Sequence, residues 1–183
     1  VDNINDLESL IRNINGAGYF AFDLETTSKD PMKSRLVGIS ISIAPGHAAY
    51  IPLGHSVGKQ IPLSDALNKL KVVFENPDIH KFTHNGNYDM TVLANYEVEV
   101  ASMTFDTMVA AHVLNEPSVG LKNLAFSRLQ TEMTPIEALI GTGKHQITMA
   151  DVPINDAMLY ASADSDMTLR LQNLFQAEVD KEE

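Results

Sequence analysis

The chain has 183 residues, enough for one domain with a full hydrophobic core, and its 44% apolar and 20% charged residues are ordinary for a globular protein. It has no cysteine, which excludes disulfides, a thiolate nucleophile and cysteine metal sites. A formal net charge of −11 argues against nucleic-acid binding through lysine and arginine, unless clustered carboxylates hold divalent cations that reverse the local charge.

The sequence pattern in the first half of the chain predicts three strands between two helices. Apolar residues recur at helical spacing from Leu7 to Ile14. An apolar and aromatic run follows, which is typical of a buried strand, and strict alternation of apolar with small residues then predicts a strand with one buried face. The predicted elements are a helix opening at Asn5 and ending at Gly16-Ala17-Gly18, strands at 19–24, 36–44 and 47–51 with a turn at 45–46, and a helix at 62–75.

The second half predicts short strands that alternate with helices. The predicted elements are a strand at 79–83, a helix at 88–96, a possible strand within 98–105, a helix at 107–114, short helices and loops at 121–143, and a long helix from 154 to about 179. This order of elements predicts a mixed α/β sheet with helices on its faces.

No run of about 18 apolar residues is present, so we expect no membrane segment. The first residues lack the basic and apolar regions of a signal peptide, and the absence of cysteine agrees with a reducing cytoplasm. The chain begins with Val1 and ends in the charged run EVDKEE. We therefore expect both ends to be cuts in a longer polypeptide.

Two carboxylates end the first predicted strand. Asp23 and Glu25 flank one leucine, and residues two apart on a strand point to the same face. The carboxyl ends of strands are common locations of α/β sites. Such a pair can also be two solvated acids at a fraying strand end. The context favours a site, because an aromatic core strand here runs directly into two acids and three hydroxyl residues.

Two further pairs of polar residues have helical spacing. Asn85 and Asp89 lie four apart after the fourth predicted strand, where an Asn-Gly turn and a favourable charge in the first helical turn are the simpler interpretation. Tyr160 and Asp164 lie four apart on the last predicted helix and share one face. Asp166 is turned about 200° away from Asp164, and we expect it to be solvated or paired.

The order of these three pairs resembles a known family. D-x-E, then N-x-x-x-D, then Y-x-x-x-D is similar to the DEDD superfamily of 3′-to-5′ exonucleases, in its tyrosine-containing DEDDy branch. The closest resemblance is to the proofreading exonuclease domain of bacterial family A DNA polymerases. It is carried by the segments FDLETTS, PGHAAYIPLGH, NGNYDMTVLANY, FDTMVAAHVLN, GTGKHQIT and YASADSDMTLRL.

The resemblance implies a ribonuclease H-like fold, an α/β arrangement with a central mixed sheet, one antiparallel strand and flanking helices. It implies that residues 1–183 form a single 3′-5′ exonuclease domain, excised from a longer DNA polymerase. The implied reaction is hydrolysis of phosphodiester bonds at the 3′ end of DNA by a two-metal-ion mechanism, which releases nucleoside 5′-monophosphates. The implied role is proofreading.

The resemblance also assigns roles to site residues. Asp23 would bridge two divalent ions, and Glu25 and Asp164 would complete the site whose ion activates water. Asp89 would support the second ion, partly through water. Tyr160 would orient the attacking water, since an unperturbed tyrosine pKa near 10 makes it a poor base at neutral pH.

Substrate contacts are implied for Thr26 and Asn85. The family often sets an apolar wedge against the last base, and Lys29 departs from that pattern, which leaves base stacking open. For Asp106 we expect helix capping rather than a direct role in the site. The basic loop at 141–146 is interpreted either as a contact to the incoming strand or as a solvated loop.

The expected cofactors are two Mg²⁺ or Mn²⁺ ions, with Zn²⁺ possible in one site, because hard cations prefer carboxylate oxygens. The histidines lack ligand spacing and are not assigned to a metal. The expected partners are the single-stranded 3′ end of DNA and the polymerase domain of the same parent chain, with no membrane. We expect the isolated domain to be monomeric and to act in the bacterial cytoplasm at the nucleoid.

Two alternatives remain open at this stage. The first keeps the fold and changes the substrate, giving an RNase D-like 3′-5′ exoribonuclease. The second is a catalytically silent structural domain of the polymerase, as in relatives that have lost the metal ligands. The presence of all four acids, Asp23, Glu25, Asp89 and Asp164, argues against it.

Overall fold

Five strands form one central mixed sheet in the computed structural model, which describes residues 1–181. The strand order is β3-β2-β1-β4-β5. β2 runs antiparallel to β1 and β3, whereas β4 and β5 continue the sheet parallel to β1. This confirms the predicted mixed sheet with one antiparallel strand. The strands are β1 (Tyr19–Thr26), β2 (Leu36–Ala44), β3 (His47–Pro52), β4 (His80–Thr83) and β5 (Met103–Asp106).

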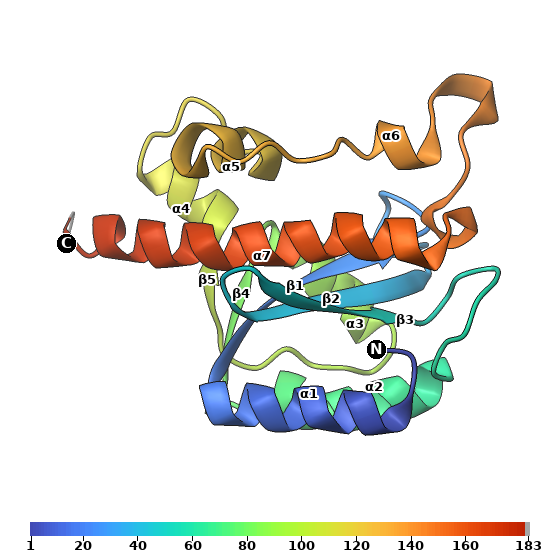
Figure 1. Cartoon of the computed structure of the whole chain (residues 1–183). Helices are drawn as coiled ribbons and strands as arrows, with labels where there is room; N and C mark the ends of the chain where they lie inside the picture. The colour runs from blue at the N-terminus through green and yellow to red at the C-terminus, as the bar shows by residue number, and fades with distance from the viewer. Residues whose placement is uncertain (182–183) are drawn as a thin grey trace.

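Helices cover both faces of this sheet (Figure 1). α1 and α2 lie together on one face, and α7 crosses the other face, with α4, α5 and α6 beyond it. Two single 3₁₀ turns, Gly143–His145 and Met149–Asp151, connect α6 to α7. The helices are α1 (Ile4–Ala17), α2 (Leu63–Phe74), α3 (Gly86–Ala94), α4 (Thr107–Val113), α5 (Leu121–Leu129), α6 (Glu137–Ile140) and α7 (Ile154–Val179).

The side-chain alternation of β1 divides its residues between two environments. Phe20, Phe22 and Leu24 join the core under α1 and α2, where the Phe22 ring meets Phe74 with centroids 5.0 Å apart. The residues between them face α7. On that side α7 contributes the small residues Ala157 and Ala161, which allow the helix to lie close to the sheet. The period of the strand therefore directs the acids of β1 toward α7.

Two predicted helix starts differ from the structure. α1 begins at Ile4 rather than Asn5, because the Asn3 side chain accepts a hydrogen bond from the Asp6 amide and caps the helix. α3 begins at Gly86 rather than residue 88, directly after Asn85, which adopts a left-handed conformation with φ 67°. Asparagine tolerates this conformation better than most residues, so the helix can start inside the predicted turn.

The other predicted elements lie close to their expected positions, including the short helices after residue 121 and the long α7. Within residues 1–181, no helix combines the length and the apolar character that crossing a membrane requires. The predicted domain end at residue 183 lies outside the described residues.

Candidate active site

Three carboxylates from β1 and α7 meet in one cluster. Asp23, Glu25 and Asp164 each offer an oxygen, and these atoms all lie within 4.8 Å of one another. Asp23 is half-buried, Glu25 is 5% exposed and Asp164 is 8% exposed. The structure thus joins residues that are far apart in the sequence and removes most of their charge from water. Such an arrangement is costly unless protons or cations compensate it.

Asp89 approaches this cluster from the first turn of α3. It is 3% exposed, and its charge acts on both Asp23 and Glu25, although it is not among the acids whose oxygens lie within 4.8 Å. Three of the four predicted metal ligands therefore form one group, and the fourth lies beside it.

Burial is the largest cause that raises the pKa of Asp23, Glu25 and Asp89, each well above the ordinary carboxyl range. Neighbouring carboxylates raise the pKa of Asp23 and Glu25 further, because like charges at short range disfavour ionisation. The cluster consequently holds protons more tightly than isolated acids do. A divalent cation would favour the ionised forms and displace those protons.

Two oxygens of the cluster lack a hydrogen-bond partner. Glu25 Oε1 and Asp164 Oδ1 are buried and accept no hydrogen bond. Burial raises the pKa of Asp164 to about 6, while the Lys122 ammonium and the Tyr160 hydroxyl oppose that rise. Buried polar atoms almost always have partners, so these two oxygens indicate a missing one. Carboxylate oxygens that accept no hydrogen bond suit a hard divalent cation, and the residues present therefore fit such an ion.

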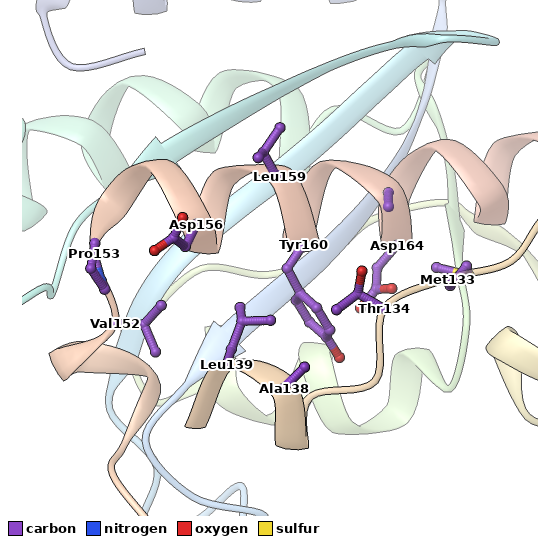
Figure 2. A pocket seen from close by; sticks show the side chains of 11 residues that line it. Met133, Thr134, Ala138, Leu139, Val152, Pro153, Asp156, Leu159, Tyr160 and Asp164 are labelled. Carbon is purple, nitrogen blue, oxygen red and sulfur yellow. The ribbon is translucent and has the colours of Figure 1, made fainter. Parts of the chain in front are cut away.

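Tyr160 and Asp164 leave α7 on the same side, as the spacing predicts, whereas Leu159 points away (Figure 2). Burial and the nearby Asp164 raise the pKa of Tyr160 above its usual value. Its hydroxyl accepts a hydrogen bond from Lys122 Nζ at 3.1 Å. The tyrosine is therefore protonated at neutral pH and is held from a second element, α5.

Asp166 faces away from the cluster, as its position on the helix predicts. Its carboxylate accepts a hydrogen bond from the Gly46 amide at 2.7 Å and pairs with Arg170 Nη2 at 3.0 Å. It is 9% exposed. Of the two expected states, the paired one is found.

Three hollows meet at Tyr160 and Asp164. The largest, about 650 Å³, extends from the cluster along the β1–β2 loop. A second of about 380 Å³, seen in Figure 2, lies beside α6, and a third of about 370 Å³ lies toward α5. Together these three hollows form what we call the groove, on the α7 side of the sheet beside the carboxylates. Its walls include Thr26, Ser28, Asn85, Ile136, Ile140 and Gln146 in the largest hollow, and His84 and Lys122 in the third.

The two predicted substrate contacts line the largest hollow in different ways. Thr26 already shares a hydrogen bond of 2.6 Å with the Tyr88 hydroxyl, which also contacts Ser28 O and Ser34 Oγ. Asn85 is exposed, and its side chain is free to meet a ligand from the left-handed corner before α3. The basic loop lies partly outside the groove, with Lys144 exposed.

Asp106 has a wider role than the predicted cap. It does cap α4, accepting from the Met108 and Val109 amides. It also accepts from the Asn85 amide at 3.1 Å and the Gly86 amide at 2.8 Å. One side chain thus fixes the starts of two helices, including α3, which carries Asp89.

The sequence analysis did not identify Lys122, Tyr88, Ile136 and Ile140 as residues that line the groove. An apolar residue in a loop or a lysine at a helix start carries no distinctive signal of its own. Their positions depend on how distant elements pack, which the local pattern does not specify. No histidine joins the acidic cluster in the part of the chain that the structure describes.

Comparisons with known proteins agree with this geometry. A family model described as 3′-5′ exonuclease matches residues 1–180. DNA polymerase I of Chloroflexus aurantiacus is 44% identical over 178 residues, which cover 96% of this chain and 19% of that protein. DNA polymerase I of Pseudomonas aeruginosa is 34% identical, covering 90% of this chain and 19% of the relative. The chain therefore spans less than a fifth of the length of these relatives.

Solved structures show the same fold at low identity. Escherichia coli RNase D, an exoribonuclease involved in structured RNA processing, has a TM-score of 0.74 at 20% identity, over 99% of this chain and 44% of that one. Brucella melitensis NrnC with bound Mg²⁺ has a TM-score of 0.66 at 20% identity, over 90% and 75%. The chain thus shares the ribonuclease H-like fold of these structures.

Proposed function

The chain belongs to the 3′-5′ exonuclease family that is present in bacterial DNA polymerase I, and from this premise we propose a reaction, a substrate and a role. The reaction is hydrolysis of the terminal phosphodiester bond at a single-stranded 3′ end of DNA, releasing nucleoside 5′-monophosphates. The observation that carries the proposal is the buried carboxylate cluster with its two oxygens that lack hydrogen-bond partners.

The acids of the cluster are proposed to hold two divalent cations, Mg²⁺ or Mn²⁺, with Zn²⁺ possible in one site. Asp23, Glu25 and Asp164 would each supply carboxylate oxygens as ligands, and Asp89 would contribute a ligand from α3. When bound, such ions supply an activated nucleophile and stabilise the charge that develops on phosphate and leaving oxygen. The proposed ions also resolve the charge problem, because a phosphate can then approach an acidic chain.

Tyr160 is proposed to orient the attacking water. A tyrosine whose pKa is raised keeps its proton at neutral pH, so it acts by hydrogen bonding and not as a base. Thr26 and Asn85, which line the same hollow as Asp23, are proposed to hold the terminal nucleotide.

The proposed biological role is proofreading within a larger DNA polymerase. The relatives are DNA polymerase I chains of which this sequence spans 19%. We accordingly expect residues 1–183 to be one domain of a longer parent chain that supplies most of the DNA affinity. We expect the isolated domain to be monomeric and the parent to act on DNA in the bacterial cytoplasm.

The decisive assay measures nucleotide release from the 3′ end of a single-stranded DNA, followed as the shortening of a 5′-labelled strand, in the presence of Mg²⁺ or Mn²⁺. Replacing a ligand should cost more than replacing a residue outside the coordination sphere, so Asp23→Asn is expected to slow release at least about a hundredfold. Asp78→Asn, an exposed acid in a distant turn, is the matched control and should leave the rate unchanged. Full activity in the Asp23 variant would refute the proposed mechanism.

The likeness to RNase D favours one second candidate, an exoribonuclease. Rates of nucleotide release from DNA and RNA strands of the same sequence, measured under identical metal conditions, distinguish the two candidate activities. Faster release from RNA would replace the proofreading role with RNA processing. A catalytically silent domain is the remaining rival, and isothermal titration that detects no Mn²⁺ binding would support it.

A further inference from the structure

Lys122 reaches from the first turns of α5 into the carboxylate cluster. Its ammonium Nζ lies 2.8 Å from the Thr134 carbonyl oxygen and 3.1 Å from the Tyr160 hydroxyl. It also lies 3.8 Å from Asp164 Oδ1 and 4.3 Å from the centroid of the Tyr160 ring. The side chain is 34% exposed. One cation therefore touches both residues that α7 contributes to the site.

The hydrogen bonds of this lysine fix its position. An ammonium group has three donors, and here two of them go to Thr134 O and Tyr160 Oη. The charge is thus held between α5, the segment before α6 and α7. A solvated surface lysine has no such restraint, and surface ion pairs of that kind contribute little.

The contact with Asp164 is electrostatic and leaves the carboxylate oxygen without a donor. At 3.8 Å the lysine is too far for a hydrogen bond, and Asp164 Oδ1 remains without a hydrogen-bond partner. The same positive charge opposes part of the rise in the pKa of Asp23, Glu25 and Asp164. The contact therefore places a positive charge beside Asp164 and leaves the carboxylate oxygen open to another ligand.

We propose that Lys122 is a positioning residue with two linked effects: it holds the Tyr160 hydroxyl in one orientation, and its fixed charge reduces the affinity of the carboxylate cluster for divalent cations. The inference rests on the proposed function. Tyr160 Oη accepts the lysine N–H, so the tyrosine proton and the remaining lone pair point away from the lysine. A divalent cation at Asp164 is repelled by the nearby ammonium.

Removing the lysine should therefore change cation affinity and catalytic rate in opposite directions. This pattern distinguishes the proposed role from a purely structural one. Loss of the lysine charge should strengthen cation binding, while loss of its hydrogen bond should weaken catalysis. A variant that merely distorts the site would weaken both, because displaced ligands bind cations less well.

The experiment compares Lys122→Met with the wild-type chain. Methionine keeps an unbranched apolar stem and removes the charge and the donors. Mn²⁺ affinity is measured by calorimetry on metal-free protein, and kcat and KM for single-stranded DNA are measured at saturating Mn²⁺. We expect the variant to bind Mn²⁺ about tenfold more tightly and to lose about tenfold in kcat, with KM changed less.

Two further variants control the comparison. Lys59→Met removes another lysine that pairs with an aspartate, Asp2, at 3.2 Å outside the groove, and should match the wild type in both measurements. Lys122→Arg keeps the charge and should restore the wild-type Mn²⁺ affinity. If Lys122→Met does not fold, Lys122→Leu, which also lacks charge and donors, takes its place, with thermal unfolding as the check.

The outcomes are distinct. Wild-type chain that neither binds Mn²⁺ nor releases nucleotides refutes the proposed function itself. An active wild type whose Lys122→Met variant binds Mn²⁺ equally or more weakly overturns the inference and leaves the proposed function intact. Tighter binding with unchanged kcat also overturns it, because the positioning of Tyr160 would then have no effect.

Discussion

The two faces of the central sheet differ in how completely their atoms are paired, although β1 contributes to both. On the face under α1 and α2, Phe20 and Phe22 are fully buried among aromatic and aliphatic neighbours. On the face under α7, the same strand presents Asp23 and Glu25 beside hollows and oxygens without hydrogen-bond partners. One face stabilises the fold, and the other carries crowded carboxylates whose charge protons or a bound cation can compensate.

The largest effect is expected from breaking the apolar face. Phe22→Ala should lower the free energy of unfolding by about 4 kcal/mol, since it removes a fully buried ring from a packed aromatic cluster. Chemical denaturation measures the change. Phe126→Ala, at a ring that is 68% exposed, is the control and should change it by less than about 0.5 kcal/mol. Equal costs at both rings would contradict the assignment of stability to this face.

Asp106 contributes both to the stability of the fold and to the position of Asp89, so its loss should affect both stability and metal binding. Asp106→Ala leaves the amides of Asn85 and Gly86 and the start of α4 without their acceptor, at a cost of about 2 kcal/mol in unfolding free energy. Because α3 carries Asp89, Mn²⁺ affinity should also fall, by about tenfold. Calorimetry and denaturation on the same preparation test this. A loss of stability with unchanged Mn²⁺ affinity would show that Asp89 does not depend on this contact.

The smallest change in the free energy of unfolding, and the only increase, is expected when an acid of the cluster is neutralised. Raised folded-state pKa values mean that the folded chain binds more protons than the unfolded chain above a pH of about 4. The stability of the metal-free protein should therefore fall as the pH rises from that value through the folded pKa values. Asp23→Asn should reduce this slope and stabilise the metal-free chain at pH 8 by about 1 kcal/mol.

Thermal unfolding in a chelator at several pH values measures that slope. Excess Mg²⁺ should stabilise the wild type at pH 8 and the Asp23→Asn variant less, because binding to the folded state is what supplies the stabilisation. Parallel pH profiles for wild type and variant would mean that the cluster does not strain the fold.

Sequence patterns predicted what depends on local periodicity. The alternation in β1 placed Asp23 and Glu25 on one face, and helical spacing placed Tyr160 beside Asp164. That these pairs meet was implied by the family resemblance alone, because the distance between β1 and α7 depends on small residues packed at their contact.

Long-range contacts explain what the patterns missed. The start of α3 shifted because a carboxylate from another element, Asp106, satisfies its first amides. Lys122 reaches the cluster only because α5 lies against α7. Such polar contacts between distant elements leave no periodic trace in the sequence.

The contact between Asp166 and the Gly46 amide helps to fix the rotational register of α7, together with the apolar residues that the helix buries. Two residues along a helix correspond to about 200° of rotation, so Asp166 binds the β2–β3 turn on the side opposite to Asp164. A shift of α7 by one residue would rotate Asp164 by about 100°, away from β1. The hairpin turn therefore contributes to the angle at which a carboxylate on the far side of the helix is presented, although it contains none of the residues of the site.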